Sequence, residues 1–224
     1  LLDKDVLEPG NSVRWPLGRS HWGLSKVVAL KHHLSQEYPW TTVTGRKGTI
    51  GGSTTDENDI QGGAQGPAAE LEGMIRAADI ISDERWHALA FLCREAAKPL
   101  AIGYATEGAA GGVVISIPGN APFCLSCVSR HWEDETLPQP AVDPTGTVLP
   151  IGCNQPTFTG GGFDLQEVSL QVVRTVLSLI DDCDDDRNWD MAVLSHRDGN
   201  RRILPRWTGQ RLVKHAGCTC EPRE

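Results

Sequence analysis

The sequence predicts an α/β fold in which a mostly parallel sheet carries helices on its faces. Segments that read as short strands alternate with longer segments whose apolar side chains recur at helical spacing. This alternation is typical of strand–helix–strand units, because neighbouring parallel strands need a long crossover between them. The 224 residues are 39% hydrophobic and 22% charged, which supplies enough apolar material for a core and excludes disordered and fibrous classes.

In the first third of the chain we expect one helix between two short strands. Residues 23–35 carry apolar side chains three and four positions apart, which predicts an amphipathic helix. The strand end is expected at residues 1–2 and the second strand at residues 41–50. The Gly-rich stretch 51–67 shows no periodicity and is long for a connection within a compact domain, so we expect a mobile loop there.

The remainder of the chain alternates more regularly and then changes character after Pro118. The expected helices lie at 70–77, 83–97 and 165–180, and the expected strands at 78–81, 99–104, 111–117, 191–196 and 202–205. Residues 128–164 contain many Gly, Pro and Asp residues and predict a crossover loop region. The last two strands are expected to form a C-terminal antiparallel region, and residues 1–224 to form a single domain.

The charge balance and the N-terminus limit the classes of partner. Lys and Arg number 21 and Asp and Glu 29, so the net charge is −8 with neutral His. An acidic chain is a poor general binder of nucleic acid or of anionic membranes. No apolar run approaches the roughly 18 residues of a membrane helix, and the first ten residues read as neither a signal nor a transit peptide. We therefore expect neither nucleic acid nor membrane as a partner.

Seven cysteines give the strongest chemical signal in the composition. An odd number without a signal peptide argues for a reducing compartment, hence a cytoplasmic location, and against a disulfide framework. Cys124 and Cys127 form a CxxC pair, and Cys218 and Cys220 a CxC pair. Two such pairs can supply four thiolates to one tetrahedral zinc ion, which would staple the C-terminal region to the core. Two unrelated reduced pairs, or a redox-active CxxC, are the alternatives.

The other three cysteines differ in their surroundings. Cys93 lies in an apolar helical stretch and is expected to be a buried small hydrophobe. Cys183 lies in an acidic run, where carboxylates would keep the thiol protonated. Cys153 stands in a Gly- and Pro-rich loop shortly before a predicted helix, a place where a thiol can be a nucleophile. A loop cysteine without a role is the alternative interpretation.

The first 30 residues carry a resemblance to a known family. Asp3 and Asp5 follow a strand, then come Asn11, Arg14 and a Gly-x-x-Lys ending at Lys26. This combination resembles the adenylation domain of ubiquitin-activating enzymes and their bacterial relatives, the ThiF/MoeB/HesA superfamily. The similarity continues in four further stretches, ADIISD, KPLAIGYATEGAAGGVVISIPGNAPFCLSC, GCNQPTFTGGGFDLQEVSLQVVRTVLSL and HAGCTC. It implies a Rossmann-like sheet.

The resemblance also implies an activity and its cofactors. ATP would adenylate the C-terminal glycine of a ubiquitin-like or sulfur-carrier protein, and Cys153 would then take the acyl group as a thioester or acyl disulfide. Asp3 or Asp5 would bind the ribose, and Asn11 would position the phosphates held by Arg14 and Lys26. Asp83 would hold Mg²⁺. A conjugating-enzyme partner and a homodimer are implied as well.

Each of these side chains also has a plain structural interpretation. Lys26 on a helix face is ordinarily solvated, and Arg14 alone could make a surface salt bridge of little worth. Asp83 could simply cap the helix that it precedes.

Three departures from the family pattern qualify the expected activity. The glycine-rich ATP loop, which in this family precedes the Asp-x-Asp strand, does not occur in the chain, so we expect an upstream segment to supply it. Ser82-Asp83-Glu84 stands where Thr-Asp-Asn is usual, and Trp15 where Gln or His follows the arginine. The competing hypothesis is a non-catalytic scaffold or dimerisation half of an activating enzyme. A nicotinamide-dependent oxidoreductase is a third and weaker one, and a bacterial conjugation system is the favoured branch of the first.

Overall fold

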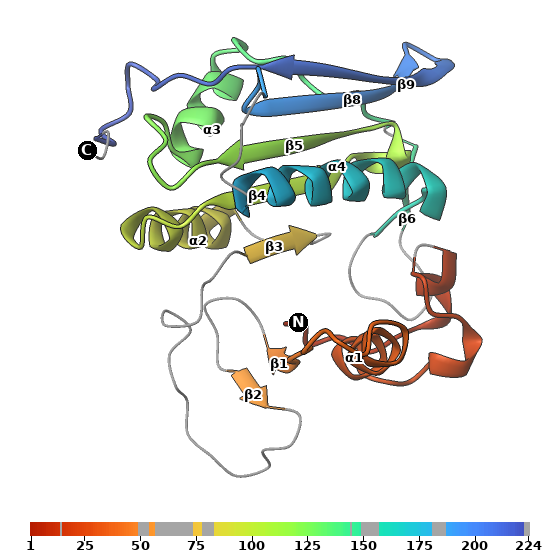
Figure 1. Ribbon diagram of the computed structural model, residues 1–224. Coiled ribbons are helices and arrows are strands. Elements are labelled where there is room, and N and C mark those ends of the chain that lie inside the picture. Colours follow the sequence, from red (N-terminus) through yellow and green to blue (C-terminus); the bar gives the residue numbers. More distant parts are fainter. Residues whose placement is uncertain are drawn as a thin grey trace. The chain divides into compact units, whose positions relative to one another are not determined.

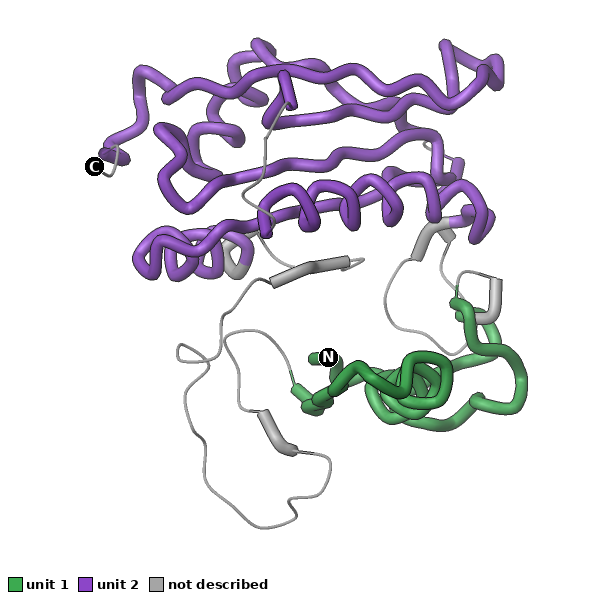
Figure 2. The backbone as a smooth tube through the Cα atoms, in the orientation of Figure 1, with its two compact units in different colours: residues 1–69 green, residues 70–224 purple. Residues whose placement is uncertain are grey.

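The computed structural model describes residues 1–13, 15–48, 54–56, 74–77, 83–143, 145–148, 157–180 and 187–221. The chain forms two compact units, Leu1–Ala69 and Glu70–Glu224, which Figure 2 distinguishes by colour. No helix in the described ranges is long and apolar enough to cross a membrane. The expected mobile loop at 51–67 lies almost wholly outside the described residues, apart from a short strand.

The first unit is built around helix α1, Lys26–Glu37. Short 3-10 turns at Pro9–Val13 and Arg19–His21 precede it, and strands β1, Arg46–Gly48, and β2, Thr54–Asp56, form an antiparallel pair after it. Leu2 bridges Arg46 in parallel orientation, so the chain start and β1 flank a helical crossover. Leu7, Leu17 and Ala29 are buried together against Trp15.

The helix predicted at residues 23–35 is confirmed, although it begins three residues later. Residues 23–25 pair with residues 5–7 instead: Leu7 N–H donates to Leu24 at 2.8 Å, and Gly23 N–H donates to the Leu7 carbonyl at 2.8 Å. Gly23 adopts a φ of 85°, a conformation that glycine takes at little cost. Backbone pairing therefore holds this turn out of the helix.

The second unit is a five-stranded sheet in the order β3-β4-β5-β8-β9, shown in Figure 1. Its strands are β3 Met74–Ala77, β4 Leu100–Ala105, β5 Gly111–Ile117, β8 Met191–Asp198 and β9 Arg201–Gln210. Only β3 and β4 pair in parallel, and the other three described pairs are antiparallel. The expectation of a mostly parallel sheet is therefore corrected for this part of the chain, which is a mixed sheet.

The connections explain why these pairs are antiparallel. The turn between β4 and β5 contains only the 3-10 segment η4, Glu107–Ala109, and its two neighbours, too few residues for a parallel crossover. The β8–β9 hairpin turns at Gly199, which has a φ of 56°. The predicted antiparallel region near the C-terminus is thus confirmed, and both of its strands are longer than expected.

Residues 74–77 form a strand where the sequence predicted part of a helix. Met74, Ile75, Arg76 and Ala77 align in parallel with residues 100–103 of β4. These residues have a helical propensity, but propensity is a weak preference, and the pairing with β4 overrides it. The strand predicted at 78–81 lies outside the described residues. Helix α2, Asp83–Glu95, follows and lies in the crossover between the parallel strands β3 and β4.

Helix α4, Gly162–Ile180, packs along one face of the sheet and supplies half of the residues of one buried cluster. Val168, Val172 and Val176 of α4 are buried against the sheet residues Ala101, Val114 and Leu194. The approach is close: a Cβ built on Gly103 would lie 2.1 Å from a Val172 methyl carbon. Gly103 therefore lets the helix settle onto β4.

The crossover loop region predicted at residues 128–164 is only partly irregular. Helix α3, Leu125–Glu133, overlaps its start, and α4 begins before its end. Between them β6, Thr147–Val148, pairs with β7, Thr157–Phe158, in antiparallel orientation. The α3 pattern was obscured by the cysteine pair and by short polar residues, although its apolar side chains share one face.

Candidate functional site

The four cysteines predicted to bind zinc lie together in the second unit. Their Sγ atoms are all within 4.8 Å of one another. Sγ of Cys124 lies 3.8 Å from that of Cys127 and 3.7 Å from that of Cys218, and Cys127 lies 3.5 Å from Cys220. A tetrahedral ion with Zn–S bonds of about 2.3 Å requires sulfur separations near 3.8 Å. The cluster can hold a metal ion and is compatible with zinc.

Local structure presents two of these thiols from one helix end. Cys124 is the N-cap of α3 and Cys127 lies in its first turn. Both thiols therefore come from neighbouring turns of the same segment and reach one cluster. The CxC spacing of the other pair, which is tighter than usual, brings both Sγ atoms to the same cluster without distorting it.

Burial and the neighbouring thiols shift the pKa values of Cys124, Cys218 and Cys220. Burial raises the pKa of Cys124. Although burial opposes ionisation, hydrogen bonds from the Cys220 backbone and from the neighbouring thiols lower the pKa of Cys218 to about 7. Burial and the neighbouring thiols raise the pKa of Cys220. A cation entering the cluster would displace the remaining protons, so metal binding should weaken as pH falls.

Arg94 joins the two cysteine segments, a role that the sequence did not reveal. Its guanidinium donates to the Phe123 carbonyl at 2.9 Å and to the Ala121 carbonyl at 3.4 Å. It also donates to the carbonyl of Glu221, just beyond the CxC pair. The arginine is far from all three partners in sequence, so no local pattern could have identified it.

The segment before the CxC pair is held against the C-terminal end of α3. His215 Nε2 donates to a carboxylate oxygen of Asp134 at 2.8 Å, and Gly217 N–H donates to His215 Nδ1 at 3.0 Å. His131 packs edge-on against the His215 ring. Cys218 N–H donates to the His215 carbonyl, and this hydrogen bond positions the backbone that carries the Cys218 thiol.

In the first unit the structure brings three of the predicted nucleotide-binding residues together. Lys26 Nζ lies 3.3 Å from Asp5 Oδ2, and Asp3 Oδ1 accepts from Asp5 N–H at 2.8 Å. The side chain of Lys26 is 16% exposed, and its ammonium lies 6.0 Å from the centre of the Trp15 ring. Asp5 also accepts Lys26 N–H through its carbonyl. The strand end and the helix start thus form one cluster of two carboxylates and a cation.

Asn11 has a structural contact of its own, and Arg14 falls outside the described residues. The amide oxygen of Asn11 accepts from Glu8 N–H at 2.8 Å and so shapes the turn after the Asp-x-Asp segment. Trp15 N–H donates to the Asn11 carbonyl at 2.9 Å. Lys26 is therefore not a freely solvated lysine, because its side chain is mostly buried beside Asp5. The contact of Asn11 with Glu8 is compatible with a structural role and with the predicted role in positioning phosphates.

Asp83, the predicted magnesium residue, is the first residue of α2 in the second unit. Its side chain is not among those that the structure describes, so the magnesium role stays a prediction. Cys153 lies between β6 and β7, outside the described residues. Cys183 is also outside them, and Cys93 is 2% exposed, as expected of a buried hydrophobe.

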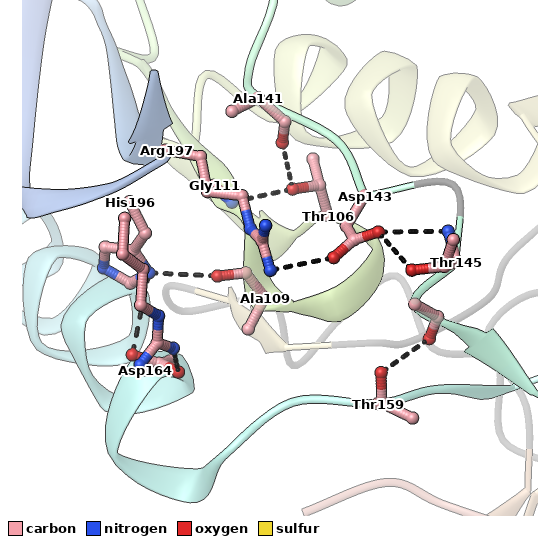
Figure 3. Close-up of polar contacts among 12 residues, drawn as sticks. Thr106, Ala109, Gly111, Ala141, Asp143, Thr145, Thr159, Asp164, His196 and Arg197 are labelled. Atoms are coloured by element: carbon pink, nitrogen blue, oxygen red, sulfur yellow. Dashed lines mark hydrogen bonds and ion pairs between the residues drawn. The ribbon is translucent and has the colours of Figure 1, made fainter. Parts of the chain in front are cut away.

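A polar network that the sequence did not predict surrounds the turn between β4 and β5, as Figure 3 shows. His196 is 4% exposed and donates from Nδ1 to the Ala109 carbonyl at 3.0 Å. Asp164 Oδ1 lies 3.8 Å from that nitrogen, and Asp164 Oδ2 accepts from Arg202 at 2.7 Å. His196 Nε2 is buried with no hydrogen-bond partner in the described part of the chain. Ala109 has a φ of 49°, so the network holds a strained turn.

Asp143 anchors the other side of this turn. Its carboxylate accepts from the Thr145 hydroxyl at 2.6 Å and from Thr145 N–H at 3.0 Å, and pairs with Arg197 at 2.9 Å. Thr106 Oγ1 donates to the Ala141 carbonyl at 2.5 Å and accepts from Gly111 N–H. These contacts fix the chain on both sides of η4.

We expect Asp143 to contribute stability that disappears in acid. The hydrogen bonds from Thr145, with Arg197 nearby, hold the pKa of Asp143 below its ordinary value of 3.8. A lowered folded-state pKa contributes stability above pH 3.8 that is lost as the pH falls through the folded value. Thr145→Ala should raise the Asp143 pKa toward 3.8, as carbonyl-detected NMR titration can measure. An Asp143 pKa at or above the ordinary value in the native chain would contradict the contact.

The cysteine cluster and the polar network around η4 lie at opposite ends of β5. Gly111, where the strand begins, follows η4, and Ile117, where it ends, leads into the CxxC segment. Seven residues of strand span about 23 Å. A metal ion in the cysteine cluster would therefore act on the structure of the tail and not on chemistry at the other end.

Two curated proteins of Sinorhizobium fredii are similar to the chain over nearly its whole length. The protein y4oA is 44% identical over 226 residues, which cover 98% of this chain and 38% of that protein. The protein y4qC is 31% identical over 231 residues, covering 98% of this chain and 39% of that protein. Both are described as uncharacterized, and the chain spans about two fifths of their length. No family model matches the chain.

Proposed function

We propose that the chain is part of an adenylating enzyme of the ThiF/MoeB/HesA type, which activates the C-terminal glycine of a ubiquitin-like or sulfur-carrier protein with ATP. The observation that carries the proposal is the cluster of Asp3, Asp5 and Lys26. A carboxylate at a strand end is suited to ribose hydroxyls, and a lysine beside it is suited to phosphate oxygens. Bound nucleotide would draw the Lys26 ammonium from Asp5 to the phosphates.

The fold supports this proposal in two ways. Parallel pairing across a helix occurs between Leu2 and Arg46 in the first unit and between β3 and β4 in the second, as a Rossmann-like sheet requires. The four-cysteine cluster matches the zinc site that the resemblance implies. Asp83, the first residue of α2, would hold Mg²⁺.

In the proposed second step the Cys153 thiolate attacks the carbonyl carbon of the acyl adenylate. A thioester forms, the carbonyl–phosphate bond breaks, and AMP leaves with the electron pair of that bond. In a sulfur-carrier branch the nucleophile would instead be a persulfide on Cys153, supplied by a separate sulfur donor, and its attack on the acyl adenylate would give an acyl disulfide and AMP. We place this step in a bacterial conjugation system, with a conjugating enzyme as the next acceptor and the cytoplasm as its location.

Two measurements on the full-length protein test the proposal. ATP–pyrophosphate exchange should depend on a partner protein that ends in glycine, and should not occur with the partner lacking that residue. Cys153→Ala should leave the exchange unchanged but abolish the thiol-sensitive conjugate, with Cys93→Ala as the matched control. Absence of exchange would favour the non-catalytic scaffold. A conjugate that survives in Cys153→Ala would place the nucleophile elsewhere.

A further inference from the structure

A second group of polar side chains lines a cavity of about 290 Å³ where α2 and α3 meet. His87 comes from α2, and Ser126, Ser129, Arg130 and Glu133 come from α3. The last three lie three, four and seven positions after Ser126, so all four share one face of that helix. None of these side chains has a part in the adenylation chemistry proposed above.

The hydrogen bonds around His87 show which of its ring nitrogens carries the proton. Ser129 Oγ donates to the Leu125 carbonyl at 3.3 Å, which uses its single hydroxyl proton. The contact between Ser129 Oγ and His87 Nε2, at 3.4 Å, therefore has the Nε2–H as its donor. A neutral imidazole carries one N–H, so its Nδ1 presents a lone pair. Ser126 Oγ lies 3.3 Å from that nitrogen and donates to it.

We propose that Ser126 is the nucleophile of a second site, which transfers acyl groups from small uncharged esters to water, with His87 as its general base. A serine hydroxyl is reactive when an adjacent base can take its proton and a third group orients that base. Ser129 is the third group here, a positioning residue that stands where the Ser-His-Asp triad has a carboxylate. Arg130, one turn beyond Ser126 on the same face, can donate to the carbonyl oxygen under attack.

The reaction takes place in two steps. Ser126 Oγ bonds to the carbonyl carbon while its proton passes to His87 Nδ1, then the bond from that carbon to the alcohol oxygen breaks, and the leaving alkoxide takes the proton from His87. Water attacks the acyl-serine in the same way, with His87 taking a proton from the water and returning it to Ser126. Ester and water thus give acid and alcohol.

The charges around the cavity favour an uncharged substrate. Arg130 and Glu133 carry opposite charges, so together with the neutral His87 they leave the lining without a net charge. The Glu133 carboxylate would repel a phosphate ester, whereas an uncharged carboxylic ester incurs no such cost. The proposed site uses no nucleotide and is therefore independent of the adenylating activity.

A fluorophosphonate probe on the full-length protein tests the nucleophile. Ser126 Oγ should attack the phosphorus and expel fluoride, which leaves a label on Ser126 that peptide mass spectrometry locates. His87→Gln keeps a hydrogen-bonding side chain but removes the base, and it should slow the labelling roughly 100-fold or more. Ser169 on α4, whose hydroxyl also donates to a carbonyl one turn back, is the internal control and should stay unlabelled. Labelling of Ser126 no faster than that of Ser169, or unchanged by His87→Gln, overturns the proposal.

Substitutions of Ser129 separate positioning of the base from a merely structural role. Ser129→Ala should slow the labelling of Ser126 about tenfold, and Ser129→Thr, which keeps the hydroxyl, should restore the native rate within about threefold. A loss that Ser129→Thr does not restore would refute the positioning role.

Release of p-nitrophenolate from p-nitrophenyl butyrate tests the whole reaction. The native protein should hydrolyse this uncharged ester without ATP, Ser126→Ala should remove the turnover, and Ser169→Ala should leave it unchanged. A Ser126→Ala protein with the native rate, or a native protein without turnover, overturns the esterase activity. Neither result bears on ATP–pyrophosphate exchange.

Discussion

Cys127→Ser should abolish metal binding at the cysteine cluster and lower the free energy of unfolding by more than about 4 kcal/mol. Cys127 is fully buried, and its Sγ lies within reach of both Cys124 and Cys220. Serine keeps the shape of the side chain but is a poor zinc ligand, so the remaining three thiols would hold the ion far more weakly. Elemental analysis of the purified chain and thermal unfolding followed by circular dichroism measure the two effects.

Cys93→Ser is the matched control for this experiment. Cys93 is as deeply buried as Cys127 but lies in α2, outside the cluster, and burial raises the pKa of its thiol. The control should keep one zinc ion per chain even if the core is somewhat destabilised by the hydroxyl. A native chain without zinc, or a Cys127→Ser chain with a full complement of it, would exclude the four-cysteine metal site.

Lys26→Ala should reduce ATP–pyrophosphate exchange by about 10²- to 10³-fold, the usual effect of removing one preorganised donor to a developing charge. The lysine is largely buried beside Asp5 and below the Trp15 ring, so its ammonium is held near the proposed phosphate position. Alanine would leave the Asp5 carboxylate without its cation, and the unpaired carboxylate would repel the phosphates of the nucleotide. Arg14→Ala should act in the same direction.

Lys4→Ala serves as the control because Lys4 is exposed and lies between the two aspartates in sequence. It removes the same charge from the same segment without touching the proposed contact, and the exchange rate should stay within about twofold of the native value. Equal exchange rates for the native chain and the Lys26→Ala variant would show that Lys26 does not act on the phosphates. Comparable losses for both lysine variants would indicate a general charge effect.

The sequence predicted the parts of the fold that depend on local pattern. The β-branched run of β5, the periodicity of α4 and the pairing of the last two strands are confirmed. The direction of the strands could not be read in the same way, because it depends on how short the η4 and Gly199 connections are. Residues 74–77 became a strand through pairing with β4, a contact that local propensity does not report.

The candidate sites divide along the same line. The four cysteines were predictable since metal ligands occur as short, recognisable spacings, and the Asp3, Asp5 and Lys26 cluster followed a similar motif. Arg94 and His196 were not predictable, because each acts on backbone carbonyls that are distant in sequence. Carbonyl oxygens belong to every residue, so such contacts leave no signature in residue types.

The cysteine cluster has a consequence for how the second unit is made. Cys124 and Cys218 are 94 residues apart, and Cys127 and Cys220 are 93 apart. A metal ion joining them closes a long loop, and because the four-thiol site exists only in the folded chain, the free energy of metal binding adds to the stability of the fold. On the ribosome this closure must wait until residues 218–220 have emerged. Metal supply at that moment would then govern how long the newly made sheet remains open to proteolysis.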